Sequence, residues 1–191
     1  MNLIFTLDSR GRWVALSPEM TELIPKHLSW PRRLWAKAKA RFLSLPFRFL
    51  SEDKIFIRGN RERGPLVVYH SPLQSLRIDL HWRHFLRRRK IRRLFYLLVE
   101  ILLLPVSGLA ALLPGPNVFF GVLALLIITH WQSLRGLRQL SRLQPRFEAR
   151  ESLANWEKAI RQGKLEAETS LIEQIEREFG LERARKILLP G

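Results

Sequence analysis

The sequence predicts a mainly α-helical membrane protein. Its centre is a two-helix transmembrane hairpin, with a small α+β region before it and a helical tail after it. Residues 94–131 form a long apolar run that contains one formal charge, Glu100, and one histidine, His130. The chain breaker PGPN divides this run. Basic residues flank the run on both sides, a pattern typical of membrane helix ends that stay on the inner side.

The charge of the chain is unevenly distributed. The 191 residues include 33 Lys and Arg against 17 Asp and Glu, a formal net charge of +16. From residue 148 onward acids and bases nearly balance, so the excess belongs to residues 1–147. Such a local excess indicates an anionic partner, either nucleic acid or an anionic membrane surface. The absence of cysteine excludes disulfides and thiolate chemistry.

Residues 1–72 are expected to form a soluble α+β region. NLIFTL and WVAL alternate like strands around the turn-forming DSRGR, which predicts a hairpin. The segment 29–45 predicts a basic amphipathic helix, packed on its own domain or lying on a membrane surface. Residues 55–59 and 65–70 are two further strand candidates. The first residues lack the composition of a signal peptide, and their acids argue against a transit peptide.

Residues 73–146 contain a basic helix and the hydrophobic pair. The helix, expected over 73–93, continues directly into the first span, 94–113, which is about 30 Å long as a helix and matches the hydrocarbon thickness. The second span, 118–134, is shorter, so a re-entrant hairpin stays open beside a spanning one. The turn is expected at four residues that break helices or favour turns and caps: Pro114, Gly115, Pro116 and Asn117.

Basic residues on both flanks predict that both termini lie on the cytoplasmic or matrix side. The same residues are candidates for binding anionic lipid headgroups. They are Arg83, Arg87, Arg88, Arg89, Lys90, Arg92, Arg93, Arg135 and Arg138. Trp82 and Phe85 among the arginines also permit a nucleic-acid interpretation. Direct continuity with the apolar run favours lipid.

The hairpin brings the two ionisable residues of the apolar run to one level. If the turn is centred between Gly115 and Pro116, Glu100 lies opposite Trp131, one residue from His130. Intramembrane ionisable groups usually pair or serve transport. Glu100 and His130 are therefore candidates for carrying a proton or ion, or for sensing pH. The alternative is that water and headgroups satisfy both side chains near the inner interface.

Residues 147–191 are expected to form a soluble helical tail. Its helices at 151–162 and 165–179 stop at Gly163 and Gly180. His81 and His84 have no third ligand nearby, so no metal site is expected. No catalytic, phosphate-binding or dinucleotide motif occurs. An enzyme, a cofactor and a nucleic-acid partner are therefore not expected.

The stretch LLPGPNVFFGVLALLIITHWQSLRGLRQL resembles the core of the mitochondrial K+–H+ exchange-related family. The turn and the helix after it carry the resemblance. The residues concerned are Leu113, Pro114, Pro116, Asn117, Phe119, Phe120, His130, Trp131, Arg135 and Gly136. A weaker resemblance links the turn to small bacterial membrane proteins named for PGPGW. In this chain the motif continues with Asn and Val instead.

The resemblance implies a component of K+–H+ exchange that acts in cation–proton homeostasis as a subunit or regulator. K+ and H+ are then its ions, and the mitochondrial inner membrane is its location, or the bacterial inner membrane for a bacterial relative. Two transmembrane helices are too few to surround a transport pathway, so a homo-oligomer or a membrane complex is expected. The alternative is a membrane anchor or scaffold without transport, whose basic face binds anionic lipid or a protein partner.

Overall fold

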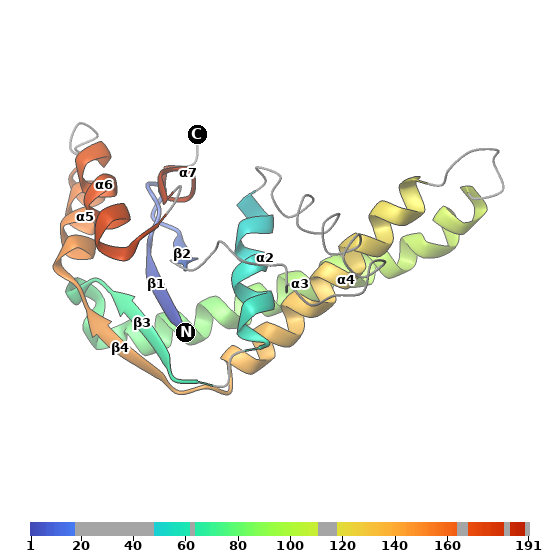
Figure 1. Cartoon of the computed structure of the whole chain (residues 1–191), viewed down its shortest axis with the longest axis horizontal. Helices are drawn as coiled ribbons and strands as arrows, with labels where there is room; N and C mark the ends of the chain where they lie inside the picture. Colours follow the sequence, from blue (N-terminus) through green and yellow to red (C-terminus); the bar gives the residue numbers. More distant parts are fainter. Residues whose placement is uncertain (18–47, 62–63, 111–117, 164–167, 182–183, 190–191) are drawn as a thin grey trace. The chain divides into compact units, whose positions relative to one another are not determined.

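The computed structural model describes residues 1–17, 48–61, 64–110, 118–163, 168–181 and 184–189. The chain divides into two compact units (Figure 1). Unit 1 comprises Met1–His27, Arg63–Phe85 and Leu143–Gly191, and unit 2 comprises Leu28–Glu62 and Leu86–Arg142. The amphipathic helix expected at 29–45 and the turn expected at 114–117 lie outside the described residues.

Unit 1 is built on a four-stranded sheet with the strand order β2-β1-β3-β4. β1 (Asn2–Leu7) and β2 (Trp13–Leu16) form the antiparallel hairpin expected at the N-terminus. β3 (Leu66–His70) pairs parallel with β1, and β4 (Pro145–Ala149) pairs parallel with β3. Parallel neighbours need long crossover connections, and the residues of unit 2 lie in the two crossovers of this sheet.

The side chains of β1 alternate between the two faces of the sheet. On one face Ile4 joins a buried cluster with α5 (Glu151–Gln162), α6 (Glu168–Phe179) and α7 (Ala184–Leu188). Trp156 of α5 belongs to this cluster, and its Nε1 donates a hydrogen bond to the carbonyl of Leu7 at 2.8 Å. On the other face Phe5 contacts Trp82 and Phe85.

Unit 2 is helical in its described residues. It contains α2 (Arg48–Gly59), α3 (Ile78–Ala110) from residue 86 onward, and α4 (Val118–Leu140). A short 3-10 helix, η1 (Pro72–Arg77), precedes α3 in unit 1. Glycine permits a close approach of α2 and α4, because a Cβ placed on Gly136 would lie 1.6 Å from the carbonyl oxygen of Phe56.

The predicted fold class is wrong. The chain is a mixed α/β protein with a four-stranded sheet, not a two-helix transmembrane hairpin. Among the described residues one helical segment, Phe120–Leu140, is long and apolar enough to cross a membrane, and 44% of its apolar window is buried. The apolar face of α4 packs on α2, and a buried core helix has the same composition as a spanning one.

Two local predictions are also wrong. Residues 55–59, expected as a strand, form the second half of α2, where Ile55 and Phe56 are buried. Residues 73–146 were expected to contain helices and no strand, but α4 ends at Leu140 and residues 145–149 form β4. In both places long-range packing overrides the local pattern, because β4 obtains its ladder from β3 and α2 obtains its partner from α4.

Candidate proton-binding site

The three helices that the structure describes in unit 2 enclose a cluster of charged side chains. We call it the unit 2 charge cluster. It consists of Glu52, Asp53, Arg89, Arg93, Glu100 and His130. The first two residues lie on α2, the next three on α3 and the last on α4. Burying charge is unfavourable unless the groups are paired, so their geometry decides what the cluster does.

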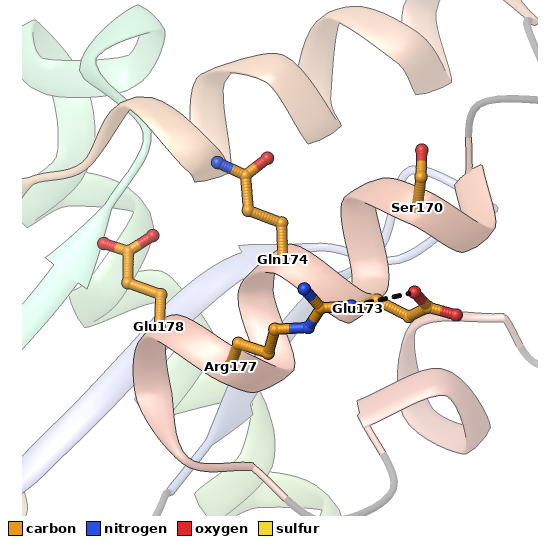
Figure 2. A pocket seen from close by; sticks show the side chains of 5 residues that line it. All are labelled: Ser170, Glu173, Gln174, Arg177 and Glu178. Atoms are coloured by element: carbon orange, nitrogen blue, oxygen red, sulfur yellow. Dashed lines mark ion pairs between the residues drawn. The ribbon is translucent and has the colours of Figure 1, made fainter.

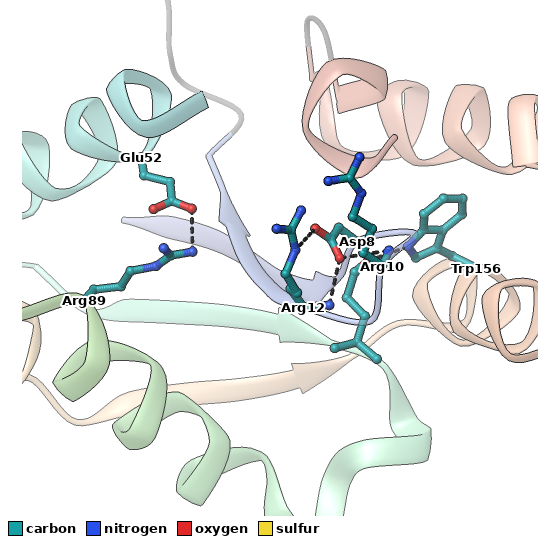
Figure 3. A network of polar contacts seen from close by, with 7 residues as sticks. Asp8, Arg10, Arg12, Glu52, Arg89 and Trp156 are labelled. Carbon is teal, nitrogen blue, oxygen red and sulfur yellow. Dashed lines mark hydrogen bonds and ion pairs between the residues drawn. The ribbon is translucent and has the colours of Figure 1, made fainter. Parts of the chain in front are cut away.

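Two ion pairs connect α2 with α3. Arg89 pairs with Glu52 (Figure 3), and its Nη2 lies 2.6 Å from Glu52 Oε1. Arg93 Nε lies 2.8 Å from Asp53 Oδ1, with exposed side-chain fractions of 1% and 0%. The two arginines are one helical turn apart and therefore share a face of α3, while the two acids are adjacent on α2. These contacts fix the facing surfaces of the two helices.

His130 lies between two carboxylates from the other two helices. Its Nδ1 is 2.7 Å from Glu100 Oε1, and its Nε2 is 4.0 Å from Asp53 Oδ2. The ring of Tyr96 lies beside the imidazole, with centroids 5.7 Å apart. The structure thus brings together the two residues that the sequence placed at one level. Their role in carrying a proton or ion stays a prediction.

Asp53 holds a proton more readily than an ordinary aspartate. Burial raises its pKa above the usual 3.8, and this effect exceeds the opposing effects of Arg93, Ser133, His130 and Arg92. The cause is desolvation, which disfavours the charged carboxylate in a side chain with no exposed surface. The carboxyl of Asp53 is therefore suited to accept a proton from a neighbouring group.

A pocket opens beside one end of this arrangement. It has a volume of ≈ 260 Å³ and is lined by Tyr96, Val99, Glu100, Leu126 and His130. The acid–imidazole pair thus lines a mainly apolar pocket, whereas Asp53 is completely buried and does not line it. Of the two carboxylates that flank His130, one faces the pocket and the other lies inside the helix core.

A second pocket, of ≈ 590 Å³, lies along α6 in unit 1 (Figure 2). Its lining side chains project from one helix, and Arg177 pairs with Glu173 at 3.5 Å while both are largely exposed. This is the composition of a solvated helix face. Among the described residues no group of three or more His, Cys, Asp or Glu is arranged to hold a metal ion.

The candidates for headgroup binding fall into two groups. Arg89 and Arg93 are engaged inside unit 2, so their guanidinium groups already have carboxylate partners. Arg83 is exposed and pairs with Asp79 at 2.9 Å. The other candidates are exposed: Arg87, Arg88, Lys90, Arg92, Arg135 and Arg138. Their binding to lipid stays a prediction, and the turn residues at 114–117 lie outside the described residues.

Sequence reasoning missed Glu52 and Asp53. Their segment, LSEDKIF, has an ordinary mixture of polar and apolar residues and gives no sign of burial. The available signal was the spacing of Arg89 and Arg93, which places two cations on one helical face. Only the fold shows that α2 supplies the matching acids.

The family model for mitochondrial K+–H+ exchange-related proteins matches residues 33–144. The chain belongs to this family. The match covers more than half of the sequence and includes the whole unit 2 charge cluster. The family name links its members to potassium–proton exchange. No curated protein and no solved structure matches the chain.

Proposed function

We propose that the chain is a proton-handling component of potassium–proton exchange, acting at a membrane as a subunit or regulator. The observation that carries this proposal is the contact between Glu100 and His130 beside the unit 2 pocket. An imidazole paired with a carboxylate is a common arrangement for proton uptake and release, because both groups change protonation under mild conditions. The choice of K+ and H+ as the exchanged ions rests on the name of the matched family.

The pocket supports the proton side of exchange more than the potassium side. A desolvated K+ ion needs several oxygen ligands, usually a ring of carbonyl groups. Among the side chains that line the pocket only Tyr96 and Glu100 carry oxygen atoms. We therefore assign proton binding to this chain and place the potassium pathway in a homo-oligomer or in a partner of a membrane complex.

Ion movement in membrane vesicles tests the proposal. Vesicles from cells with and without the full-length chain receive a K+ gradient, and a pH-sensitive dye reports proton movement. We expect His130→Ala and Glu100→Gln to abolish the part of the signal that depends on the chain. The matched control is His84→Ala, which removes an exposed histidine of the same helix as Glu100. Unchanged K+-dependent proton movement in both His130→Ala and Glu100→Gln would refute the proposal.

A second candidate function, a lipid-binding anchor or scaffold, is favoured by the surface of α3. We call this surface the α3 stripe. It consists of Ile91, Leu94, Phe95, Leu98, Ile101, Leu102 and Val106, all of them exposed. Their spacing of three and four residues puts them on one face of the helix. Exposed Arg87 and Arg88 precede the stripe by one turn on the same face. Apolar residues next to basic ones complement an anionic bilayer surface.

Vesicle flotation separates this function from exchange. The full-length chain is mixed with anionic or neutral phospholipid vesicles, and the bound fraction is measured after centrifugation. Leu102→Asp should weaken binding to anionic vesicles about tenfold or more, because it removes a leucine side chain that is 74% exposed and available for insertion. Leu80→Asp changes another exposed leucine of α3 and serves as control. Equal binding of both variants to anionic vesicles would exclude the α3 stripe as the lipid-binding surface. Lipid binding without any K+-dependent proton movement would favour the anchor.

A further inference from the structure

We propose that His130 relays a proton between Glu100 at the pocket and Asp53 inside the helix core, so that Asp53 is an internal proton-binding site. This inference deepens the proposed function and rests on it for its physiological role. Its physical basis is the position of one imidazole between two carboxylates that differ in exposure to the pocket.

The two nitrogens of His130 face different partners. Nδ1 is within hydrogen-bond distance of Glu100, and Nε2 points toward Asp53 across 4.0 Å. That second distance exceeds a hydrogen bond by about 1 Å, which a small movement of the ring or one bridging water closes. Among the described residues, Tyr96 of α3 is the aromatic neighbour of the imidazole. In the described part of unit 2, Arg93 and Arg92 of α3 and Ser133 of α4 also act on Asp53.

Charge balance leaves one proton to distribute within the cluster. Glu52 and Arg89 neutralise each other. Arg93 carries a permanent positive charge inside the cluster, whereas Arg92 is exposed and solvent compensates its charge. Asp53, Glu100 and His130 must then hold a total charge of minus one for the buried cluster to be neutral. This requires one proton beyond that of the neutral imidazole, and the proton has three adjacent positions available. Low polarity inside the protein favours the neutral cluster over a charged one.

The transfer is balanced and reversible. A proton taken up from the pocket converts the Glu100 carboxylate to the acid. The acid gives this proton to Nδ1 of neutral His130, which becomes an imidazolium. The imidazolium releases its Nε2 proton to Asp53, and the imidazole is left with a proton on Nδ1. Glu100 is again a carboxylate that accepts a hydrogen bond from His130, and Asp53 has become a carboxylic acid.

Protonation of Asp53 changes the contact between α2 and α3. The charge attraction between Asp53 and Arg93, 2.8 Å apart, disappears when the carboxylate becomes neutral. The raised pKa of Asp53 is consistent with a group that accepts the proton. Proton arrival from the pocket is therefore coupled to the ion pair that ties α2 to α3, which gives the chain a means to report protonation to a partner.

Nuclear magnetic resonance on the full-length chain tests the relay. Ring nitrogens of histidine and carboxyl carbons of aspartate are labelled, and both are followed as a function of pH. His130→Gln identifies the His130 signals, and the three aspartates, Asp8, Asp53 and Asp79, are assigned through Asp8→Asn and Asp79→Asn. In the unsubstituted chain we expect the Asp53 carboxyl signal and the His130 ring signals to respond to the same proton-binding event.

Two variants give the decisive comparison. Asp53→Asn removes one anion beside His130 and should lower its titration midpoint by about one pH unit, a tenfold loss of proton affinity. Asp79→Asn, at an exposed carboxylate of α3, should leave the midpoint unchanged. An unchanged midpoint in Asp53→Asn overturns the relay. So does an Asp53 carboxyl that stays ionised while His130 titrates in the unsubstituted chain, a result that needs no folded variant. Coupled titration without K+-dependent proton movement would overturn the proposed function and leave the relay intact.

Discussion

Replacing Gly136 by alanine tests the close contact between α2 and α4. The added Cβ would lie 1.6 Å from the carbonyl oxygen and 2.5 Å from the carbonyl carbon of Phe56. Cβ atoms essentially never approach other atoms closer than 3.0 Å. The backbone of α2 has no freedom to rotate away as a side chain would. The two helices must therefore separate by about 1.4 Å at this point, and a close-packed core resists such a backbone shift.

The expected loss in the free energy of unfolding is about 2 kcal/mol. Overpacking in a close-packed core is unfavourable by about 1–3 kcal/mol, and a shift of α2 also stretches its ion pairs with α3. Alanine is favoured over glycine inside a helix by about 1 kcal/mol, which offsets part of this loss. Gly136→Ala should therefore lower the free energy of unfolding, because the contact with Phe56 outweighs the gain in helix propensity.

Gly121→Ala is the matched control, because Gly121 lies on the same helix and an added Cβ would meet nothing within 4 Å. It should stabilise the protein by about 0.5–1 kcal/mol through helix propensity alone. Denaturant unfolding followed by circular dichroism measures both variants, and hydrogen exchange of α2 amides reports on unit 2 separately. If Gly136→Ala is as stable as Gly121→Ala, the close approach of α2 and α4 is not as described.

Two further predictions concern buried acids. Asp8→Ala should lower the free energy of unfolding by about 2 kcal/mol. Asp8 Oδ1 accepts hydrogen bonds from the backbone amides of Arg10 and Arg12 at 3.1 and 2.7 Å in the β1–β2 turn (Figure 3). Asp8→Asn keeps one acceptor and should retain most of that stability in thermal unfolding; equal losses in both variants would contradict this explanation. For Asp53, the raised pKa means that the folded chain binds more protons than the unfolded chain above pH 3.8. Its contribution to stability is therefore present below the unfolded pKa and is lost as pH rises through the folded pKa. Asp53→Asn should remove this decline from a series of urea unfolding curves at increasing pH, and an unaltered slope would argue against the raised pKa.

Local signals in the sequence were sufficient for the elements that local chemistry determines. The N-terminal hairpin follows from DSRGR between two alternating segments, and Gly11 in that turn has a positive φ of 69°. The helices α5 and α6 end at Gly163 and Gly180, whose φ values of 65° and 61° are those of left-handed helix caps. In each case a short motif sets the backbone without help from distant residues.

Elements that depend on distant partners were not predicted. β4 is short and half exposed, and it is a strand because of its parallel ladder with β3, whose paired residues lie 79 positions earlier in the sequence. The alternation of Ile55 and Ile57 resembles a strand, yet packing on α4 makes this segment helical. The same limit applies to the candidate site. Glu100 and His130 were found from their isolation in an apolar run, whereas Asp53 stands among polar residues and is visible only in the fold.

The composition of the unit 2 charge cluster argues for function over stability. Buried ion pairs contribute little net stability, because desolvation of both charges offsets their attraction, and apolar residues of similar volume often serve equally well. Three packed helices therefore need neither Asp53 and Arg93 nor Glu100 and His130 to hold together. Each acid of the cluster has one base as its nearest partner: Glu52 has Arg89, Asp53 has Arg93 and Glu100 has His130. A purely structural pairing would need no more than this, yet His130 also stands between two carboxylates, one at the pocket and one fully buried. This arrangement provides two carboxylates that can bind a proton and an imidazole that can transfer it between them. A cluster that served only stability would not require it.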